Sequence, residues 1–145
     1  MALEALLIED NPGDVRLTLE SFRVVCEDIH LHVACDGLEA LAYLRHEGVH
    51  IKAPRPDFIL LDLNLPRMNG HEILAQIKND DSLKSIPTII VTTSTSEQDL
   101  TTSYQLQANC VVTKPLSFEE FESLVRRICD FWGSTVRLPR QRVEE

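Results

Sequence analysis

Residues 58–62 read Phe-Ile-Leu-Leu-Asp, a run of four large apolar residues that ends in a carboxylate. Such a run is typical of a strand inside a parallel sheet, because helices cover both faces of that strand. Short apolar runs recur along the chain and alternate with amphipathic stretches. They predict strands at residues 3–8, 31–35, 58–61, 88–92 and 110–112.

Helix-start signals follow the predicted strands. They are Pro12, Asp36 with Gly37, Gly70, and the capping pairs Ser96 with Asp99 and Ser117 with Glu120. Gly48 is predicted to end the second helix. The periodicity predicts inner faces that include Thr18, Leu19 and Phe22 in the first helix, Leu38 and Leu41 in the second, and Ile73, Leu74 and Ile77 in the third.

Five strand–helix units predict an α/β fold, a doubly wound five-stranded parallel sheet of order 2-1-3-4-5 with helices on both faces. This is the flavodoxin-like arrangement, in which ligands bind at the carboxyl ends of the strands. Residues 1–132 are predicted to form this one domain and residues 133–145 a C-terminal extension.

The composition excludes several classes of protein. The formal net charge of −9 argues against a nucleic-acid partner, and no apolar run is long enough to span a membrane. Without a secretory leader pattern at its start, the chain is expected to be cytoplasmic. Its four cysteines, at positions 26, 35, 110 and 129, lack paired or zinc-binding spacing and are interpreted as small buried apolar residues in a reducing compartment.

Polar residues follow four of the predicted strands. They are Glu9 and Asp10 after the first, Asp62 after the third, Thr92 at the end of the fourth and Lys114 after the fifth. Three carboxylates at one sheet edge repel each other, so a hard cation such as Mg²⁺ is expected among them, with Lys114 as a second positive charge. A carboxylate in that setting can accept a phosphoryl group, and Thr92 can donate to the phosphoryl oxygens.

Each of these residues alone has an ordinary interpretation. An acidic residue at a strand end commonly caps the next helix, a threonine suits a strand, and a lysine is usually solvated. Their joint occurrence at the correct strand ends favours a functional site.

Four segments carry a resemblance to a known family. They are LLIEDN (6–11), LLDLNLPRMNG (60–70), IVTT (90–93) and VTKP (112–115). On these residues the chain resembles the CheY-like receiver domains of response regulators in two-component systems, over about residues 3–132. The resemblance implies that Asp62 is the phosphoacceptor. It further implies that Asp10 binds Mg²⁺ directly, that Glu9 holds the metal mainly through water, and that the Asn64 backbone carbonyl is another ligand.

The resemblance also implies that Lys114 pairs with Asp62 and then with the phosphoryl group, that Thr92 moves to bond that group, and that the Lys114–Pro115 peptide is cis. Two positions depart from the family pattern. Val111 stands where many members have a rotating aromatic side chain, and Thr93 replaces a smaller residue. The aromatic switch of the family is therefore not expected here.

A closer resemblance is to stand-alone regulators paired with phytochrome-like histidine kinases. It is carried by Pro54-Arg55-Pro56, Phe131-Trp132, Thr135-Val136 and Leu138-Pro139. It implies a phytochrome-type histidine kinase as partner. With too few residues after the domain for a DNA-binding module, the output is expected to be a partner protein, another phosphoryl carrier or dimer assembly. The only chemistry expected is phosphorylation and dephosphorylation of Asp62 itself, not metabolic catalysis.

Three alternatives remain. A degenerate receiver would bind partners without phosphorylation. An aspartate-based phosphatase would need a second acid two residues after its nucleophile, where this chain has Asn64. A dinucleotide-binding module would need a glycine-rich turn after the first strand, and the sequence there is Asn11-Pro12-Gly13.

The fifth predicted helix carries more apolar residues than one sheet face normally covers. Spacings of seven join Phe118, Val125 and Trp132, then Phe121 and Ile128, then Leu124 and Phe131. These residues can all pack on their own sheet. We favour a homodimer through this helix and the extension, with Trp132 as an anchor. The five histidines, at positions 30, 32, 46, 50 and 71, are interpreted as surface or loop residues.

Overall fold

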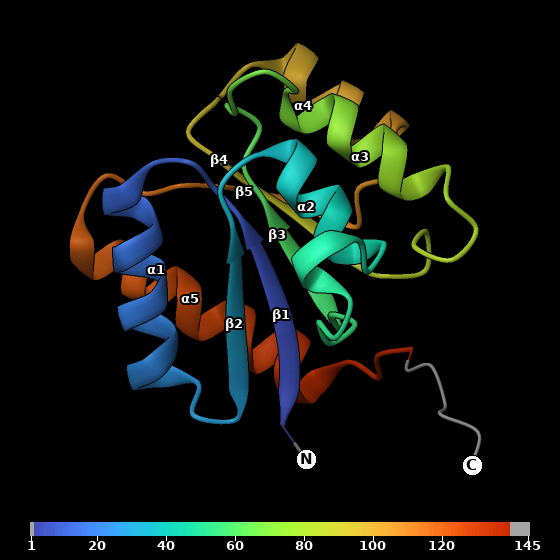
Figure 1. Cartoon of the computed structure of the whole chain (residues 1–145). Coiled ribbons are helices and arrows are strands. Elements are labelled where there is room, and N and C mark those ends of the chain that lie inside the picture. Colours follow the sequence, from blue (N-terminus) through green and yellow to red (C-terminus); the bar gives the residue numbers. More distant parts are fainter. Residues whose placement is uncertain (1, 140–145) are drawn as a thin grey trace.

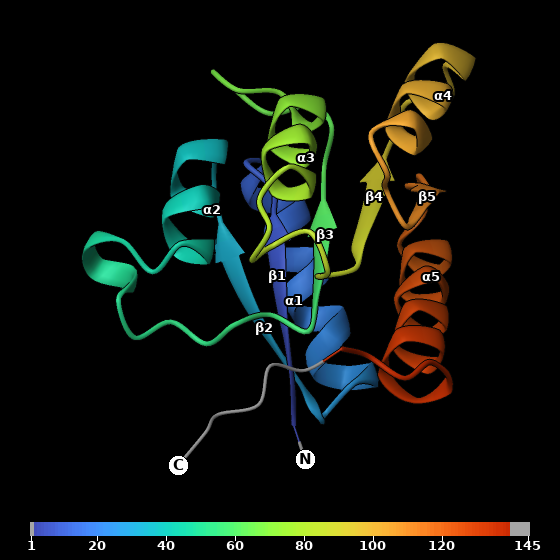
Figure 2. The ribbon, with the colours of Figure 1, turned by 90° about the vertical axis from the view of Figure 1, so that its right-hand side faces the viewer.

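The computed structural model describes residues 2–139 and contains one parallel five-stranded sheet in the order β2-β1-β3-β4-β5 (Figures 1 and 2). The strands are β1 (Leu3–Ile8), β2 (Ile29–Ala34), β3 (Phe58–Leu61), β4 (Thr88–Thr92) and β5 (Cys110–Thr113). The helices are α1 (Pro12–Val25), α2 (Gly37–Leu44), α3 (Gly70–Lys78), α4 (Glu97–Gln105) and α5 (Phe118–Asp130), with short turns η1 (Gly48–His50) and η2 (Phe131–Thr135). The predicted fold class and strand order are confirmed.

Two apolar cores lie on opposite faces of the sheet. Because side chains alternate along a strand, Leu6 and Ile8 of β1 face the core formed with α2 and α3, whereas Ala5 and Leu7 face the core formed with α1 and α5. The interior strand β3 is buried along its whole length. Its continuous apolar run therefore reflects burial on both faces.

Side-chain caps fix where the helices begin. Asn11, Asp36, Asn69, Ser96 and Ser117 each accept a backbone N–H from the residue three positions later. The predicted caps at Ser96 and Ser117 are thus confirmed for the hydrogen bond in which the serine side chain accepts the backbone N–H.

Some predicted details are wrong. β2 begins at Ile29 rather than at residue 31, because Ile29 and His30 still pair with β1. Leu19 and Leu38 are exposed, since each helix buries a face too narrow to include them. Gly48 begins η1 instead of ending α2, which stops at Leu44. The predicted inner face of α3 is confirmed.

Two cysteines are joined. Cys26 and Cys129 are buried as expected, but they form a disulfide between the end of α1 and α5, with their Cα atoms 6.2 Å apart. The interpretation of all four as free buried thiols is therefore wrong for this pair. Their separation of 103 residues gives no sequence signal of the pairing. Cys35 and Cys110 are free, but Cys35 is exposed and Cys110 only half-buried, so the expectation that they are buried is wrong as well.

The extension predicted at 133–145 is described as far as residue 139, and residues 140–145 lie outside the described residues. Leu138 of the extension packs against the core under α1 and α5. Trp132, just before the extension, packs against the same core. No helix within residues 2–139 is long and apolar enough to cross a lipid bilayer.

Candidate functional site

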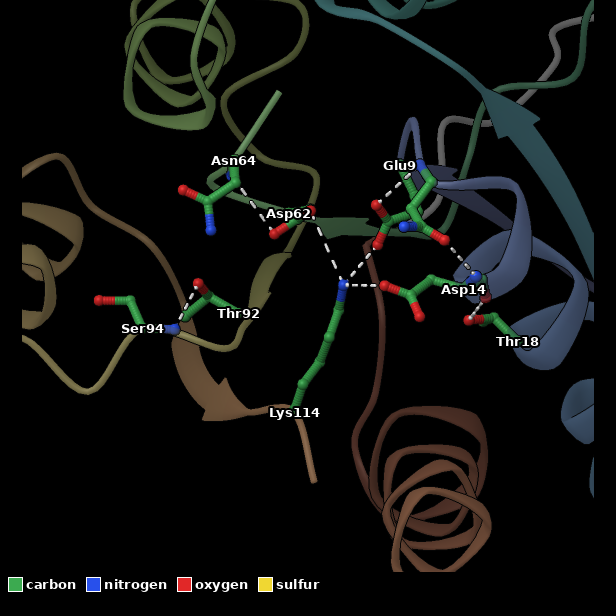
Figure 3. Close-up of polar contacts among 9 residues, drawn as sticks. Glu9, Asp14, Thr18, Asp62, Asn64, Thr92, Ser94 and Lys114 are labelled. Atoms are coloured by element: carbon green, nitrogen blue, oxygen red, sulfur yellow. Dashed lines mark hydrogen bonds and ion pairs between the residues drawn. The ribbon is translucent and has the colours of Figure 1, made fainter. Parts of the chain in front are cut away.

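The site lies at the carboxyl edge of the sheet, where β1, β3, β4 and β5 end (Figure 3). The register pairs Ile8 with Leu61 and Thr92 with Thr113, so the residues that follow leave the sheet at nearly the same height. Glu9 and Asp62 are consequently neighbours although 53 positions separate them in the sequence. Both are buried, which is unusual for carboxylates and needs compensating charge.

Lys114 supplies part of that charge. Its Nζ lies 2.6 Å from Glu9 Oε1, 3.0 Å from Asp14 Oδ2 and 3.7 Å from Asp62 Oδ2. The predicted pairing of Lys114 with Asp62 is present as an ion pair without a hydrogen bond. The Lys114 ammonium donates its hydrogen bonds to Glu9 and Asp14 instead.

The pKa values of Glu9 and Lys114 are shifted by burial and by the charges around them. Burial raises the pKa of Glu9 to about 7, with the Lys114 hydrogen bond opposing the rise and the Asp62 charge adding to it. Burial lowers the pKa of Lys114, but its hydrogen bond to Glu9 and the nearby carboxylates outweigh this and raise that pKa above its usual value. The lysine therefore stays charged, and one ammonium does not fully neutralise the carboxylates.

The carboxylates fit a divalent cation. Glu9, Asp10 and Asp62 each place an oxygen so that all three lie within 4.8 Å of one another. Asp10 is exposed, so the site opens to solvent on its side. Hard oxygen donors with room for water are what Mg²⁺ requires.

Asp62 sits on a closely packed backbone. Its Oδ1 accepts from the Asn64 N–H at 3.3 Å, and the Gly70 N–H donates to the Leu63 carbonyl at 2.9 Å. A β-carbon at Gly70 would lie 2.5 Å from the Asp62 carbonyl oxygen and 2.6 Å from Leu63 Cα, both backbone atoms. Glycine is therefore required where α3 approaches the end of β3.

Thr92 connects the site to the start of α4. It is buried, and in Figure 3 it lies on the opposite side of Asp62 from Glu9. Its Oγ1 accepts from the Ser94 N–H at 3.1 Å, while Ser94 Oγ donates to Asp99 at 2.7 Å and accepts from the Ser96 N–H at 3.2 Å. The hydroxyl proton of Thr92 remains available for a phosphoryl oxygen.

Two further expectations concern β5. The Lys114–Pro115 peptide is trans, so the predicted cis form is wrong; trans is the ordinary preference of X-Pro bonds, by about 0.5–1 kcal/mol. Val111 is half-buried and lines an open cleft together with Thr92, Ser94 and Leu100. Its small side chain leaves space beside the loop that carries Ser94.

Asp14 is a site residue that sequence reasoning missed. It occupies the first turn of α1, where an acidic residue is ordinarily explained by the helix dipole. Its backbone carbonyl accepts from Thr18 Oγ1 at 2.7 Å, and its carboxylate faces Lys114, 100 positions away. Only the tertiary structure shows that contact.

Comparisons with known proteins agree with this geometry. Residues 5–126 match the family model described as response regulator receiver domain. Response regulator Rcp1 of Synechocystis sp. is 43% identical over 134 residues, which cover 92% of this chain and 91% of that protein. The structure of the phosphorylated cyanobacterial phytochrome response regulator RcpA superposes with a TM-score of 0.92 at 43% identity, covering 97% of this chain and 100% of that one. The Mn²⁺-bound form of Rcp1 gives a TM-score of 0.89 at 42% identity, covering 95% and 99%.

Proposed function

The chain belongs to the response regulator receiver domain family, and from this premise we propose that it is a phosphorylation switch with Asp62 as acceptor. The observation that carries the proposal is the placement of buried Asp62 beside Glu9, Asp10 and Lys114. These groups can position a phosphodonor and neutralise the charge of the transferred group, which is what phosphoryl transfer chiefly requires.

The transfer uses the residues in distinct roles. An Asp62 carboxylate oxygen attacks the phosphorus of a phosphohistidine, the P–N bond breaks, and an acyl phosphate forms while the imidazole leaves. Mg²⁺ held by Asp10, Asp62 and the Asn64 carbonyl, with Glu9 through water, would supply charge neutralisation during this step. Lys114 gives up its contact with Asp14 to approach the new phosphoryl oxygens, and the Thr92 hydroxyl donates to one of them.

The proposed partner is a histidine kinase of the phytochrome type. The support is the likeness to RcpA, described as a phytochrome response regulator, and to Rcp1. On this proposal the protein catalyses only its own phosphorylation and dephosphorylation. A cytoplasmic location, where a kinase would meet it, is part of the same proposal.

Phosphotransfer tests the proposal directly. Wild-type protein with Mg²⁺ and acetyl phosphate, or with a phosphorylated phytochrome-type kinase, should gain one acyl phosphate that is labile to acid and base. Asp62→Asn should gain none, whereas the exposed control Asp28→Asn should label normally. Undiminished labelling of Asp62→Asn would refute the acceptor, and an unlabelled wild type would indicate a receiver that only binds partners.

We further propose a homodimer through α5 and the extension. Phe118 and Phe131 are exposed, while Phe121, Leu124, Val125 and Ile128 are buried on the chain's own sheet. The apolar arc is thus divided, and Phe131 at the end of the helix lines an open groove between β5 and η2 together with Val112, Trp132 and Val136. A second copy supplies apolar side chains that match this groove by symmetry.

Sedimentation should show a dimer at micromolar concentration. Because Trp132 is half-buried in its own core, Phe131→Ser is the sharper variant, and it should shift the protein toward monomer while Asp62 still labels. The exposed control Val49→Ser, on the far side of the sheet, should leave the mass unchanged. A wild type that stays monomeric with or without phosphorylation would contradict the dimer.

A further inference from the structure

Helix α4 has little apolar packing to hold it in place. Of the five α-helices within residues 2–139, it alone buries no apolar side chain, and Ser103 is the only buried one of its nine residues. Its large side chains Leu100 and Tyr104 are 38% and 49% exposed. Because the stability of a helix in a protein comes mostly from apolar packing, the position of α4 depends more than that of the other helices on single hydrogen bonds.

The buried Ser103 bonds to α3, which lies beside α4 (Figure 1). His71 Nε2 of α3 lies 2.9 Å from Ser103 Oγ, and Ser103 Oγ donates to the Asp99 carbonyl at 2.7 Å. A hydroxyl has a single proton, so Ser103 accepts from His71, whose Nε2 is the protonated nitrogen. Ser103 is fully buried, so solvent does not compete for its oxygen.

His71 itself is fixed relative to Asp62. It follows Gly70, whose N–H donates to the Leu63 carbonyl and whose Cα lies so close to the Asp62 carbonyl that no side chain fits between them. The first turn of α3 therefore cannot move independently of the end of β3. The hydrogen bond from His71 thus joins the buried residue of α4 to a fixed part of the molecule.

Asp99 connects this hydrogen bond to Thr92. Its carbonyl accepts from Ser103, and its carboxylate accepts from Ser94 Oγ at 2.7 Å. The Ser94 N–H in turn donates to Thr92 Oγ1 at 3.1 Å. A continuous hydrogen-bonded path therefore runs from His71 through α4 to the threonine beside Asp62.

We propose that His71 is a positioning residue that acts through Ser103 to hold α4 in its observed position, an inference that rests on the proposed phosphorylation of Asp62. A phosphoryl group that attracts the Thr92 hydroxyl also moves Ser94 and, through Asp99, the amino end of α4. Ser103 lies about one turn further along the helix and is bonded to the Asp99 carbonyl, so it is displaced from His71 by this movement. The His71–Ser103 hydrogen bond opposes the displacement, and its loss favours the displaced position of α4.

The ordinary interpretation is that this bond only stabilises the contact between two neighbouring helices. Its loss would then lower the melting temperature and leave the phosphorylation rate unchanged or slower. A bond that restrains α4 has the opposite effect on the rate, because its loss favours the position in which Thr92 reaches the phosphoryl group. Ser103→Ala is informative here, since alanine has a higher helix propensity than serine and the variant removes the bond without weakening the helix itself.

The rate of labelling of Asp62 by acetyl phosphate with Mg²⁺ tests the proposal. His71→Leu and Ser103→Ala should each raise the rate constant about 2- to 10-fold, as expected for the loss of one hydrogen bond that favours the less reactive position. The double variant should be no faster than either single variant, because both remove the same bond. His71→Gln keeps an N–H donor and should return the rate toward that of the wild type.

The matched control is His30→Leu, which loses one histidine hydrogen bond, to Glu4, on β2 at the opposite edge of the sheet from β5. It should label at the wild-type rate. Hydrogen exchange provides a second measurement that needs no phosphorylation: the backbone amides of α4 should exchange faster in His71→Leu than in the wild type or in His30→Leu.

The two measurements separate failure of this inference from failure of the proposed function. If no protein is labelled, the wild type included, the phosphorylation of Asp62 is refuted, and hydrogen exchange alone decides whether His71 holds α4. If the wild type is labelled but His71→Leu and Ser103→Ala are labelled no faster, the positioning role of His71 is overturned. Unchanged exchange of the α4 amides in His71→Leu would overturn it as well.

Discussion

The Lys114 ammonium lies closer to Asp14, at 3.0 Å, than to Asp62, the proposed phosphoacceptor, at 3.7 Å. Asp14 belongs to α1, and its side chain is 41% exposed, so this contact is at the open rim of the site. Lys114 is only 10% exposed and cannot be solvated if it leaves its partners. Its position between three carboxylates sets how readily it can turn to an incoming phosphoryl group.

Asp14→Asn should therefore accelerate phosphorylation of Asp62 by acetyl phosphate. The variant removes one charged, partly exposed hydrogen bond worth about 0.5–1 kcal/mol, which corresponds to a roughly two- to five-fold change in rate. The rate can be followed as labelled protein against time, with Asp28→Asn as the control. A slower rate for Asp14→Asn would show that Asp14 positions Lys114 for the reaction rather than restraining it.

The stability of the metal-free protein should fall as the pH rises from about 4.5 to 7. Glu9 has a pKa of about 7 in the folded chain against 4.5 ordinarily, so in this window the unfolded chain has released a proton that the folded chain keeps. Unfolding is then favoured by at most about 3 kcal/mol at the upper end. Denaturant melts at several pH values in the presence of EDTA should show this decrease in the free energy of unfolding.

The difference between wild type and Glu9→Gln isolates this titration from those of other groups. Glu9→Gln should lack the part of the pH dependence of the free energy of unfolding that comes from Glu9. Millimolar Mg²⁺ should remove it in the wild type, because the cation stabilises the ionised carboxylate. A slope that is the same in both proteins without metal would contradict a raised pKa at Glu9.

Gly70→Ala should lower the free energy of unfolding by about 2 kcal/mol or more, because the new methyl group meets the backbone of Asp62 and Leu63, and neither can yield without moving the Asp62 carboxylate. Phosphorylation of Asp62 should slow as well. Gly133→Ala is the control, since there the added carbon meets only the end of the Ile29 side chain, at 3.3 Å. Equal stability of the two variants would count against the close approach of α3 to β3.

Reduction should destabilise the protein. The Cys26–Cys129 disulfide closes a loop of 103 residues, and the loop-entropy model assigns such a crosslink about 4–5 kcal/mol. Thermal melts with and without dithiothreitol should differ, whereas Cys26→Ser/Cys129→Ser should melt alike in both. Denatured, unreduced wild type should show two reactive thiols, and a count of four would mean that the bond is not formed.

The sequence predicted which polar residues gather at the strand ends, but not the contacts that depend on tertiary packing. Asp62 could be predicted because a strand buried on both faces has an unmistakable apolar run, and its end lies beside that of β1 in any parallel sheet of this order. Asp14 could not, because its first-turn position has a sufficient local explanation. The disulfide depends on a pairing across 103 residues, which no short pattern in one sequence records.

The hydrogen bonds of Ser94 connect the end of β4 to the start of α4. Ser94 is hydrogen-bonded to Thr92, to Asp99 and to the Ser96 N–H, so these bonds link the end of β4 to the first turn of α4. Thr92 Oγ1 accepts from the Ser94 N–H, so its own proton can bond another oxygen while that hydrogen bond stays in place. A movement of the Thr92 hydroxyl toward Asp62 would therefore also move Ser94. On the proposed function, a phosphoryl group on Asp62 that attracts the Thr92 hydroxyl would shift the amino end of α4 into the space beside Val111, with no aromatic side chain rotating.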